Sequence, residues 1–281
     1  MSDLARLAVH TFTTKPWSLD ECIEHYARAG IGGITLWCET YAGHDLARVR
    51  RHIDDAGLAR VSVARGGFLT AADAGARAAA VAHNTRIIEE CAQLGMPLLV
   101  LVCGATPGQT VQENLTQIQE AIVALLPVAE REGVRLGIEP LHPMYAADRS
   151  AVSSLACAND LAEAIASPWC GVVVDVYHLW WDSHLEQEIR RCGAAGHLFA
   201  YHICDWKPET EHMLFDRGLM GEGCIPLRQI AAWIAAAGFD GFHEVEIFSR
   251  RWWSENQHDY LQHIITAWRR HSAPGCDEDH A

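Results

Sequence analysis

Lysine is nearly absent from this sequence of 281 residues, in which Lys15 and Lys207 are the only two. Acidic side chains outnumber basic ones, and the net charge is −14 at pH 7. A protein that binds a nucleic-acid backbone needs a basic face to neutralise the phosphates. We therefore expect no nucleic acid among the partners. Chemistry that requires a lysine amine would have to use one of these two residues.

Three further signals are missing. The ten cysteines include no C-x-x-C pair, so the sequence offers neither a zinc knuckle nor a dithiol redox motif. The segment 1–15 lacks the basic start and apolar block of a signal peptide, and no apolar run is long enough to cross a bilayer. We expect a cytoplasmic protein without a membrane partner, whose reduced cysteines fill core positions.

Short apolar segments alternate with amphipathic ones along almost the whole chain. The first reads as a strand from Arg6 to Thr13, and a capping box at Ser18–Glu21 begins the helix after it. A glycine precedes most of the later strands, as expected where a helix ends in the left-handed conformation. These later strands are Gly33–Glu39, Arg60–Arg65, Pro97–Cys103, Val134–Glu139, Gly171–Val176, His197–Cys204 and Phe242–Phe248.

The segments between the strands differ in character. Asp73–Leu94 is long and rich in alanine, and Gln109–Glu132 contains Pro127, which should kink or split a helix. The spacing of apolar residues predicts a last helix from roughly Glu255 to His271. The polar tail, residues 272–281, is expected to be disordered.

Strict alternation of strands and helices predicts a parallel sheet. An open, doubly wound sheet is one solution, but the segment His10–Trp17 lacks the glycines of a G-x-G-x-x-G phosphate loop. The other solution is a closed sheet, and eight such units form a (β/α)8 barrel, the TIM barrel. We predict an α/β protein with a single barrel domain over residues 1–271.

The strand Gly171–Val176 carries a carboxylate where its pattern calls for another apolar side chain. Gly171 and three valines are typical of a strand buried on both faces, but Asp175 interrupts the run and His178 follows it. A buried carboxylate is costly unless something pairs with it. The chemistry of a TIM barrel lies where the strands run out into loops. Asp175 therefore marks a candidate site.

Neighbouring strands end in side chains of the same kind. Glu139 ends the fifth predicted strand, His202 lies near the end of the seventh, and Glu246 lies near the end of the eighth. With Asp175 they offer oxygen and imidazole ligands at the ends of four successive strands. We therefore predict one divalent metal ion bound by these four residues. The ligand types favour Mn²⁺ first, and also suit Mg²⁺, Co²⁺ or Zn²⁺.

Two further polar side chains are expected near this site. Glu244 and Glu246 are two residues apart, so they point to the same side of their strand. Glu244 lies one layer deeper and either supports the metal site or pairs with an arginine such as Arg135. His10, at the end of the first strand, is either a ligand for a substrate hydroxyl or a satisfied interior histidine.

The strand ends resemble those of the sugar isomerase and epimerase superfamily of xylose isomerase-like TIM barrels, and the resemblance runs from the first strand to Trp253. The segments that carry it are Ile138–Leu141, Asp175–His178, His202–Asp205, Gly238–Gly241 with Glu246, and the loop Asp216–Gly223. Two features depart from the ketose 3-epimerases. Where those enzymes carry H-x-S-E, this chain has the segment ending in Asp205, and Trp180–Trp181 and Arg251–Trp253 are not part of their pattern.

The resemblance implies roles for individual residues. Glu139, Asp175, His202 and Glu246 match the ligands of one divalent metal, and the two glutamates among them also match the catalytic residues that carry protons. His178 matches a histidine that assists the metal site or a substrate oxygen, and Arg217 matches a basic residue that contacts a substrate oxygen. The complete set of candidate substrate-binding residues is His10, Trp37, His178, Asp205 and Arg217.

The function expected from this site is that of a metal-dependent isomerase or epimerase of a keto-sugar or cyclitol. A divalent ion would stabilise the cis-enediolate formed when one glutamate removes a proton, and the other glutamate would return it. Loss of a hydroxyl from the same enediolate would make the protein a lyase or dehydratase. A Schiff-base aldolase would use Lys207 instead of a metal, and a sugar-binding barrel without catalytic activity would need neither.

Aromatic side chains should line the pocket, because the apolar faces of sugars stack on rings. Six aromatic residues lie at or after the predicted strand ends, and about half of these are expected to be plain packing. They are Phe12, Trp17, Trp37, Phe68, Tyr177 and Trp206. Trp252 and Trp253 could form a subunit contact in a homo-oligomer or part of the pocket rim.

Overall fold

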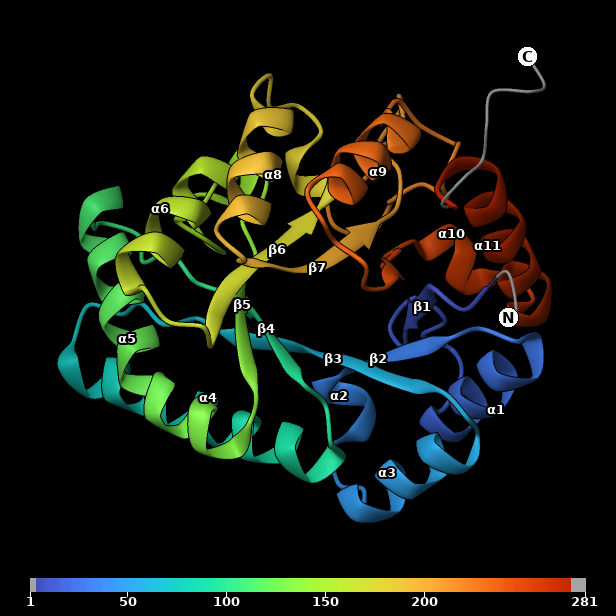
Figure 1. Cartoon of the computed structure of the whole chain (residues 1–281), viewed down its shortest axis with the longest axis horizontal. Coiled ribbons are helices and arrows are strands. Elements are labelled where there is room, and N and C mark those ends of the chain that lie inside the picture. Colours follow the sequence, from blue (N-terminus) through green and yellow to red (C-terminus); the bar gives the residue numbers. More distant parts are fainter. Residues whose placement is uncertain (1–3, 274–281) are drawn as a thin grey trace.

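Residues 4–273 are described by the computed structural model. Within this range eight parallel strands follow one another in chain order around a closed barrel, and helices surround them (Figure 1). The strands are β1 (Leu7–His10), β2 (Gly33–Trp37), β3 (Ala59–Gly67), β4 (Leu98–Val102), β5 (Arg135–Ile138), β6 (Cys170–Asp175), β7 (Leu198–Ile203) and β8 (His243–Val245). The predicted (β/α)8 barrel is confirmed.

Each strand is followed by at least one helix before the next strand begins. The helices are α1 (Leu19–Ala29), α2 (Cys38–Tyr41), α3 (Leu46–Asp55), α4 (Ala74–Leu94), α5 (Val111–Glu132), the 3-10 turn η1 (Pro143–Tyr145), α6 (Leu155–Ile165), α7 (Val176–Leu179), α8 (Leu185–Ala194), α9 (Leu227–Ala236), α10 (Arg250–Ser254) and α11 (Gln257–His271). Ser18 caps α1 and Thr110 caps α5, both with a complete capping box.

Several predicted strands extend past the observed ends. The segment predicted as strand up to Glu39 stops at Trp37, because the chain enters the single turn of α2 there. The last strand is shorter still, since β8 covers only His243–Val245 of the predicted Phe242–Phe248. At the carboxyl edge of the barrel the chain leaves the hydrogen-bonded ladder early. The side chains beyond it therefore sit on loops and one-turn helices.

Pro127 does not split its helix, so that part of the prediction is wrong. Helix α5 continues through it from Val111 to Glu132. Proline removes the hydrogen bond to the carbonyl four residues earlier, which belongs to Val123. Both Pro127 and Val123 are exposed, so solvent can hydrate the free carbonyl and the helix persists.

The barrel interior changes from apolar to polar along its axis. A small apolar cluster, separate from the main core between strands and helices, consists of Leu98, Val100, Val173 and Ala200. Side chains alternate along a strand, so Val173 shares its face with Asp175 and Ala200 shares its face with His202. The apolar cluster therefore fills the amino-terminal part of the barrel. The polar side chains lie above it, towards the carboxyl ends of the strands.

The cysteines and the helices can be compared with what the sequence predicted for disulfides and for membrane spans. The nine cysteines in the described range form no disulfide, and most are buried. Every helix between residues 4 and 273 is too short or too polar to span a bilayer. Of the predicted tail, only Ser272 and Ala273 fall within the described range, and the rest lies outside it.

Candidate metal centre

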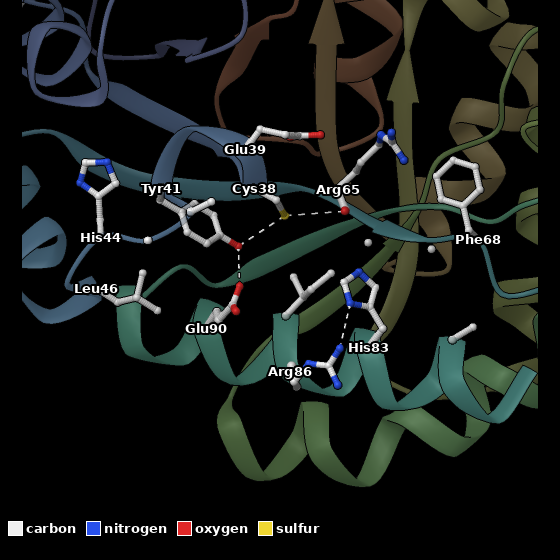
Figure 2. A pocket seen from close by; sticks show the side chains of 16 residues that line it. Cys38, Glu39, Tyr41, His44, Leu46, Arg65, Phe68, His83, Arg86 and Glu90 are labelled. Carbon is white, nitrogen blue, oxygen red and sulfur yellow. Dashed lines mark hydrogen bonds between the residues drawn. The ribbon is translucent and has the colours of Figure 1, made fainter. Parts of the chain in front are cut away.

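Two cavities lie near the carboxyl ends of the barrel strands. The larger, about 770 Å³, lies outside the barrel between α2, the end of β3 and α4 (Figure 2). The smaller, about 40 Å³, lies at the mouth of the barrel and is lined by Glu139, His178, Arg217 and Glu246 among others. The larger cavity contains none of the four predicted metal ligands. The candidate site is therefore at the smaller one.

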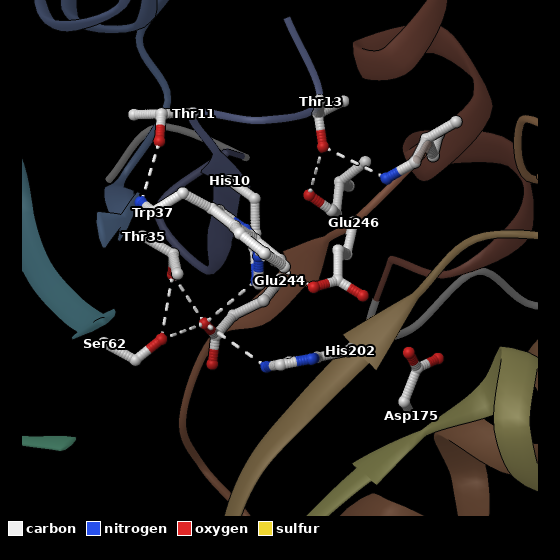
Figure 3. A network of polar contacts seen from close by, with 12 residues as sticks. His10, Thr11, Thr13, Thr35, Trp37, Ser62, Asp175, His202, Glu244 and Glu246 are labelled. Carbon is white, nitrogen blue, oxygen red and sulfur yellow. Dashed lines mark hydrogen bonds and ion pairs between the residues drawn. The ribbon is translucent and has the colours of Figure 1, made fainter. Parts of the chain in front are cut away.

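The four predicted metal ligands meet at this mouth. Asp175 is the last residue of β6, Glu139 and Glu246 directly follow β5 and β8, and His202 lies in β7. All four side chains are buried, and each offers a ligand atom within 4.8 Å of those of the other three. Figure 3 shows Asp175, His202 and Glu246 converging from three neighbouring strands. The structure thus places side by side the four residues that the sequence predicted as metal ligands.

One guanidinium lies among these carboxylates. Arg217 is 3% exposed, and its Nη1 donates to Glu246 Oε2 at 2.6 Å and to Asp175 Oδ2 at 3.1 Å. Its planar group also lies over the rings of Tyr177 and Phe248, 4.5 and 4.7 Å from their centres. These contacts hold the only arginine of the cluster against two of the four candidate ligands.

Burial and mutual repulsion shift the acid–base properties of the cluster. Burial raises the pKa of Asp175 to about 7; Arg217 opposes this rise, and the carboxylates of Glu246 and Glu139 add to it. Burial alone would lower the pKa of His202, but Glu244 and Glu139 overcome it and raise that pKa to about 10. The raised pKa of His202 reflects the carboxylates that surround it.

Glu244 forms a supporting layer beneath the four residues. Its Oε2 accepts hydrogen bonds from Thr35 Oγ1 at 2.6 Å and from Ser62 Oγ at 2.7 Å. The same oxygen lies 3.4 Å from His10 Nε2 and 3.7 Å from His202 Nε2. The suggested pairing with Arg135 is wrong. That guanidinium instead lies over the ring of Phe199, 4.6 Å from its centre.

His10 and Trp37 form one unit on the other side of the site. Trp37 Nε1 donates to His10 Nδ1 at 3.1 Å, and an indole N–H can only donate, so this histidine nitrogen is the acceptor. His10 is fully buried between this indole and the carboxylates of Glu244 and Glu246. Trp37 lines the small cavity, whereas His10 does not. The structure favours the interior role for His10 over direct contact with a substrate.

His178 lies on the cavity wall beside the cluster. Its Nε2 is 3.3 Å from Arg217 Nη2 and 3.6 Å from Asp175 Oδ2. Burial, reinforced by the charge of Arg217, holds the pKa of His178 well below its usual value. A neutral imidazole in this position can accept or donate a hydrogen bond to a ligand in the cavity.

Asp205 was predicted to contact the substrate, but in the structure it binds backbone N–H groups instead. Its two carboxylate oxygens accept four backbone N–H groups at 2.8–3.0 Å, and it does not line the small cavity. The donors are Trp206, Gly221, Gly223 and Ile225. The carboxylate therefore holds the loop that carries Arg217, and we do not assign it to the substrate.

Most of the predicted aromatic residues, and Lys207, lie outside the small cavity. Of the six aromatic residues named from the sequence, Trp37 alone lines the small cavity, and Phe68 lines the larger one. Trp253 makes contacts inside its own chain, because its Nε1 donates to the carbonyls of Phe12 and Thr13. Lys207 Nζ donates to Asp216 at 2.6 Å, away from the cavity, so a Schiff-base role has no structural support.

Several lining residues could not be singled out from the sequence. They are Arg65, Val102, Leu141, Tyr145, Arg149, Leu214 and Phe248. Most of them follow strands on loops, where residue periodicity gives no direction for a side chain. Arg65 and Phe248 carried a positional signal, because each is the last residue of a predicted strand.

The residues present fit a divalent cation. Four buried carboxylates, Glu139, Asp175, Glu244 and Glu246, face one guanidinium, which leaves three negative charges for histidines or a bound cation to balance. His202 Nε2 is buried and has no hydrogen-bond partner among the described residues. Carboxylate oxygens with one imidazole suit Mn²⁺, Mg²⁺ or Zn²⁺.

Comparisons with known proteins agree with this architecture. The chain is similar to protein SMc04130 from Sinorhizobium meliloti 1021, with 39% identity over 95% of this chain and 98% of that one and a TM-score of 0.92. It is similar in fold to the IolI protein solved with a zinc atom (19% identity, 93% and 96% covered, TM-score 0.82). It is also similar in fold to D-psicose 3-epimerase solved with D-fructose (16% identity, 94% and 97% covered, TM-score 0.76). Comparison with curated proteins gave no match.

The family assignment rests on two findings. The model of the xylose isomerase-like TIM barrel matches residues 23–271, which is most of the chain. The similarity to the Sinorhizobium protein covers nearly the full length of both chains. The chain therefore belongs to the xylose isomerase-like TIM barrel family.

Proposed function

We propose that this protein is a divalent-metal-dependent isomerase or epimerase that acts on a keto-sugar or cyclitol. The observation that carries the proposal is the group of four buried ligands whose donor atoms lie within 4.8 Å of one another. Its fold is also that of a zinc-containing IolI protein and of sugar epimerases. Mn²⁺ is the ion we propose first, because oxygen donors dominate the set.

Glu139, Asp175, His202 and Glu246 would hold the ion. When bound, a divalent ion polarises a substrate carbonyl and so acidifies the neighbouring C–H bond. Glu139 and Glu246 line the same cavity, and their strands β5 and β8 are separated around the barrel by β6 and β7. One glutamate can therefore take a proton from one side of a substrate and the other can deliver it from another side. This arrangement supports epimerisation.

The remaining lining residues orient the substrate and exclude water. His178 and Arg217 present nitrogen atoms to the cavity beside the carboxylates, and Trp37 and Phe248 supply apolar ring surface. At about 40 Å³ the cavity is far smaller than ligand sites of roughly 300–1,000 Å³. Leu214 forms part of the cavity wall, and its segment is held where Tyr145 and Tyr177 donate to the Met213 carbonyl. We propose that this segment opens to admit the substrate.

Hydrogen exchange tests the proposal directly. The Mn²⁺-loaded protein would be incubated in D₂O with a panel of ketoses and keto-inositols, and products would be weighed by mass spectrometry. We expect one deuterium at the carbon beside the carbonyl without loss of water. Glu139→Gln and Glu246→Gln should each lower the rate by about 10²-fold or more.

Glu130→Gln, an exposed glutamate of α5 that lines neither cavity, serves as the matched control and should keep the rate. Loss of water from the product would instead make the protein a lyase or dehydratase. A metal-loaded protein that exchanges no hydrogen in any keto-substrate, or one that is indifferent to both glutamine variants, would refute the proposed function.

A further inference from the structure

Two arginines on the wall of the catalytic cavity have no part in the proposed proton transfer. Arg65 and Arg149 line the same small cavity as Glu139 and Glu246, and both are half-buried. Arg65 comes from the end of β3, and Arg149 from the loop between β5 and α6. They therefore approach the cavity from separate segments of the chain.

A bulge in β3 aims Arg65 at the cavity. Ala64 pairs with Val100 of β4 and Gly66 pairs with the next residue, Leu101, so Arg65 is the extra residue of the ladder. A β-bulge re-aims the side chain that it carries. The guanidinium then lies against aromatic rings, with its carbon 4.7 Å from the centre of Phe68 and 5.9 Å from that of Trp37.

The charge of these two arginines is poorly compensated. Within residues 4–273 the Arg65 guanidinium makes no ion pair, although the exposed Glu39 also lines the larger cavity beside it. Arg149 has one distant partner, with its Nε 3.9 Å from an oxygen of the exposed Asp148, and its guanidinium lies over the Tyr145 ring. Ring contacts fix a guanidinium without neutralising it.

Two other basic groups near the site have carboxylate partners. Arg217 contacts Asp175 and Glu246, and Lys207 contacts Asp216. In a chain with a net charge of −14, carboxylates were available to pair Arg65 and Arg149 as well. Two cations left without close partners at a cavity mouth fit an anion that arrives with the substrate. A guanidinium binds a carboxylate or a phosphate through two parallel hydrogen bonds.

Space for such a group exists beyond Arg65. Arg65 lines both the small cavity and the larger one of about 770 Å³, and no other residue between 4 and 273 lines both. Figure 2 shows its side chain near Phe68 at one end of the larger cavity. A substrate whose reacting carbons lie beside Glu139 and Glu246 could therefore direct its far end toward Arg65.

Building on the proposed function, we infer that the substrate is an acidic ketose or acidic cyclitol, and that Arg65 and Arg149 bind its carboxylate or phosphate. The oxyanion lies away from the carbons that exchange protons. Neutral sugars, such as the ligand of the D-psicose 3-epimerase structure, would lack this contact.

Binding and exchange measured side by side test the inference. The probes are D-fructose, D-fructuronate and D-fructose 6-phosphate, each titrated calorimetrically into Mn²⁺-loaded protein and followed in D₂O. We expect one acid to bind at least about tenfold more tightly than the neutral ketose, with an affinity that falls as NaCl rises. The tighter of the two acids identifies the anion as carboxylate or phosphate.

Variants separate the arginines from general effects. Arg65→Gln and Arg149→Gln should each raise the Kd and KM for the acid on the order of 10- to 100-fold and leave those for D-fructose unchanged. Arg65→Lys should recover part of the affinity, because it keeps the charge but loses the fork. Arg28→Gln, an exposed arginine in the last turn of α1 that lines neither cavity, is the matched control and should behave as wild type. Circular dichroism would verify that each variant is folded.

The outcomes for this inference and for the proposed function are distinguishable. Equal binding of acidic and neutral probes, binding of neither acid, or arginine variants that leave acid binding unchanged would overturn the inference, even if a ketose exchanges deuterium. Conversely, arginine-dependent binding of an acid without any hydrogen exchange would support the anion site and count against the isomerase or epimerase.

Discussion

Arg217 is the residue whose environment says most about the site. It is 3% exposed and donates to Asp175 and Glu246, and within residues 4–273 it supplies the only guanidinium among the buried carboxylates of the site. Removing one partner from such a group leaves unpaired buried charge, which typically costs about 3–5 kcal/mol. The same two carboxylates are proposed metal ligands, so a bound cation should offset part of this loss.

Arg217→Met should therefore destabilise the chelator-treated protein by about 3–5 kcal/mol and the Mn²⁺-loaded protein by less. Urea unfolding with chelator and with excess Mn²⁺ measures both values. Arg86→Met provides an exposed control. Equal destabilisation in the two conditions would show that the arginine and the metal do not share these carboxylates.

His243, at the start of β8, couples stability to pH. It is 3% exposed, and burial, with a smaller effect of Arg6, lowers its pKa to about 4. In the unfolded chain a histidine titrates near pH 6.5, so between about pH 6.5 and 4 the unfolded state binds a proton that the folded state does not. The free energy of unfolding must then fall as the pH drops through this window.

Replacing His243 should remove its contribution to the pH dependence of the free energy of unfolding. His243→Phe keeps a ring against Tyr201 and Trp268 and should make the loss of stability from pH 7 to pH 4.5 smaller by about 2 kcal/mol. Urea midpoints of both proteins at the two pH values check this. An unchanged difference between the two pH values would mean that His243 is protonated in the folded protein.

The loop between β7 and α9 is the element on which the site depends most. Asp205 organises it by accepting four backbone N–H groups, and Gly223 approaches so closely that a Cβ there would clash with the Trp206 carbonyl and the Asp205 carboxylate. Arg217 lies within the same loop. The geometry of the cluster thus rests on residues that never touch it.

Asp205→Asn should lower the free energy of unfolding by about 2 kcal/mol, because an amide nitrogen cannot accept the N–H groups that the lost oxygen held. Gly223→Ala should act in the same direction. Trypsin should cleave both variants faster after Arg217, which is buried while the loop is intact and is followed by Gly218. The kcat should also fall, because Arg217 is no longer fixed. Asp240→Asn, an exposed aspartate, is the control. Proteolysis and kcat equal to wild type would exclude this role for the loop.

The elements differ in how far the sequence could predict them. Glycine followed by an apolar run located most of the strands after the first, because a helix stop and a buried strand each have a strong local signature. The ends were less accurate, and single turns such as α2 and α7 were missed because four residues are too few to show a helical period. Pro127 was expected to split its helix because proline removes a backbone hydrogen bond. The helix continues because solvent can hydrate the free carbonyl of the exposed Val123.

At the level of the whole molecule, barrel closure explains why the candidate site was predictable in part. Once eight strands close, the residues at their carboxyl ends must face one another, so Glu139, Asp175, His202 and Glu246 could be grouped from their positions alone. Arg65 could not, because its direction depends on a register shift between β3 and β4. Neither could the role of Asp205, which is set by a loop that folds back on it.

The proposed function requires that Glu139, Asp175, His202 and Glu246 bind a divalent ion. Elemental analysis of protein purified without chelator, followed by calorimetric titration of the stripped protein with Mn²⁺, measures this directly. We predict about one ion per chain for wild type and for the exposed control His83→Ala, and loss of binding in folded Asp175→Asn and His202→Ala. Metal content and affinity that stay at the wild-type level in both site variants would contradict the claim.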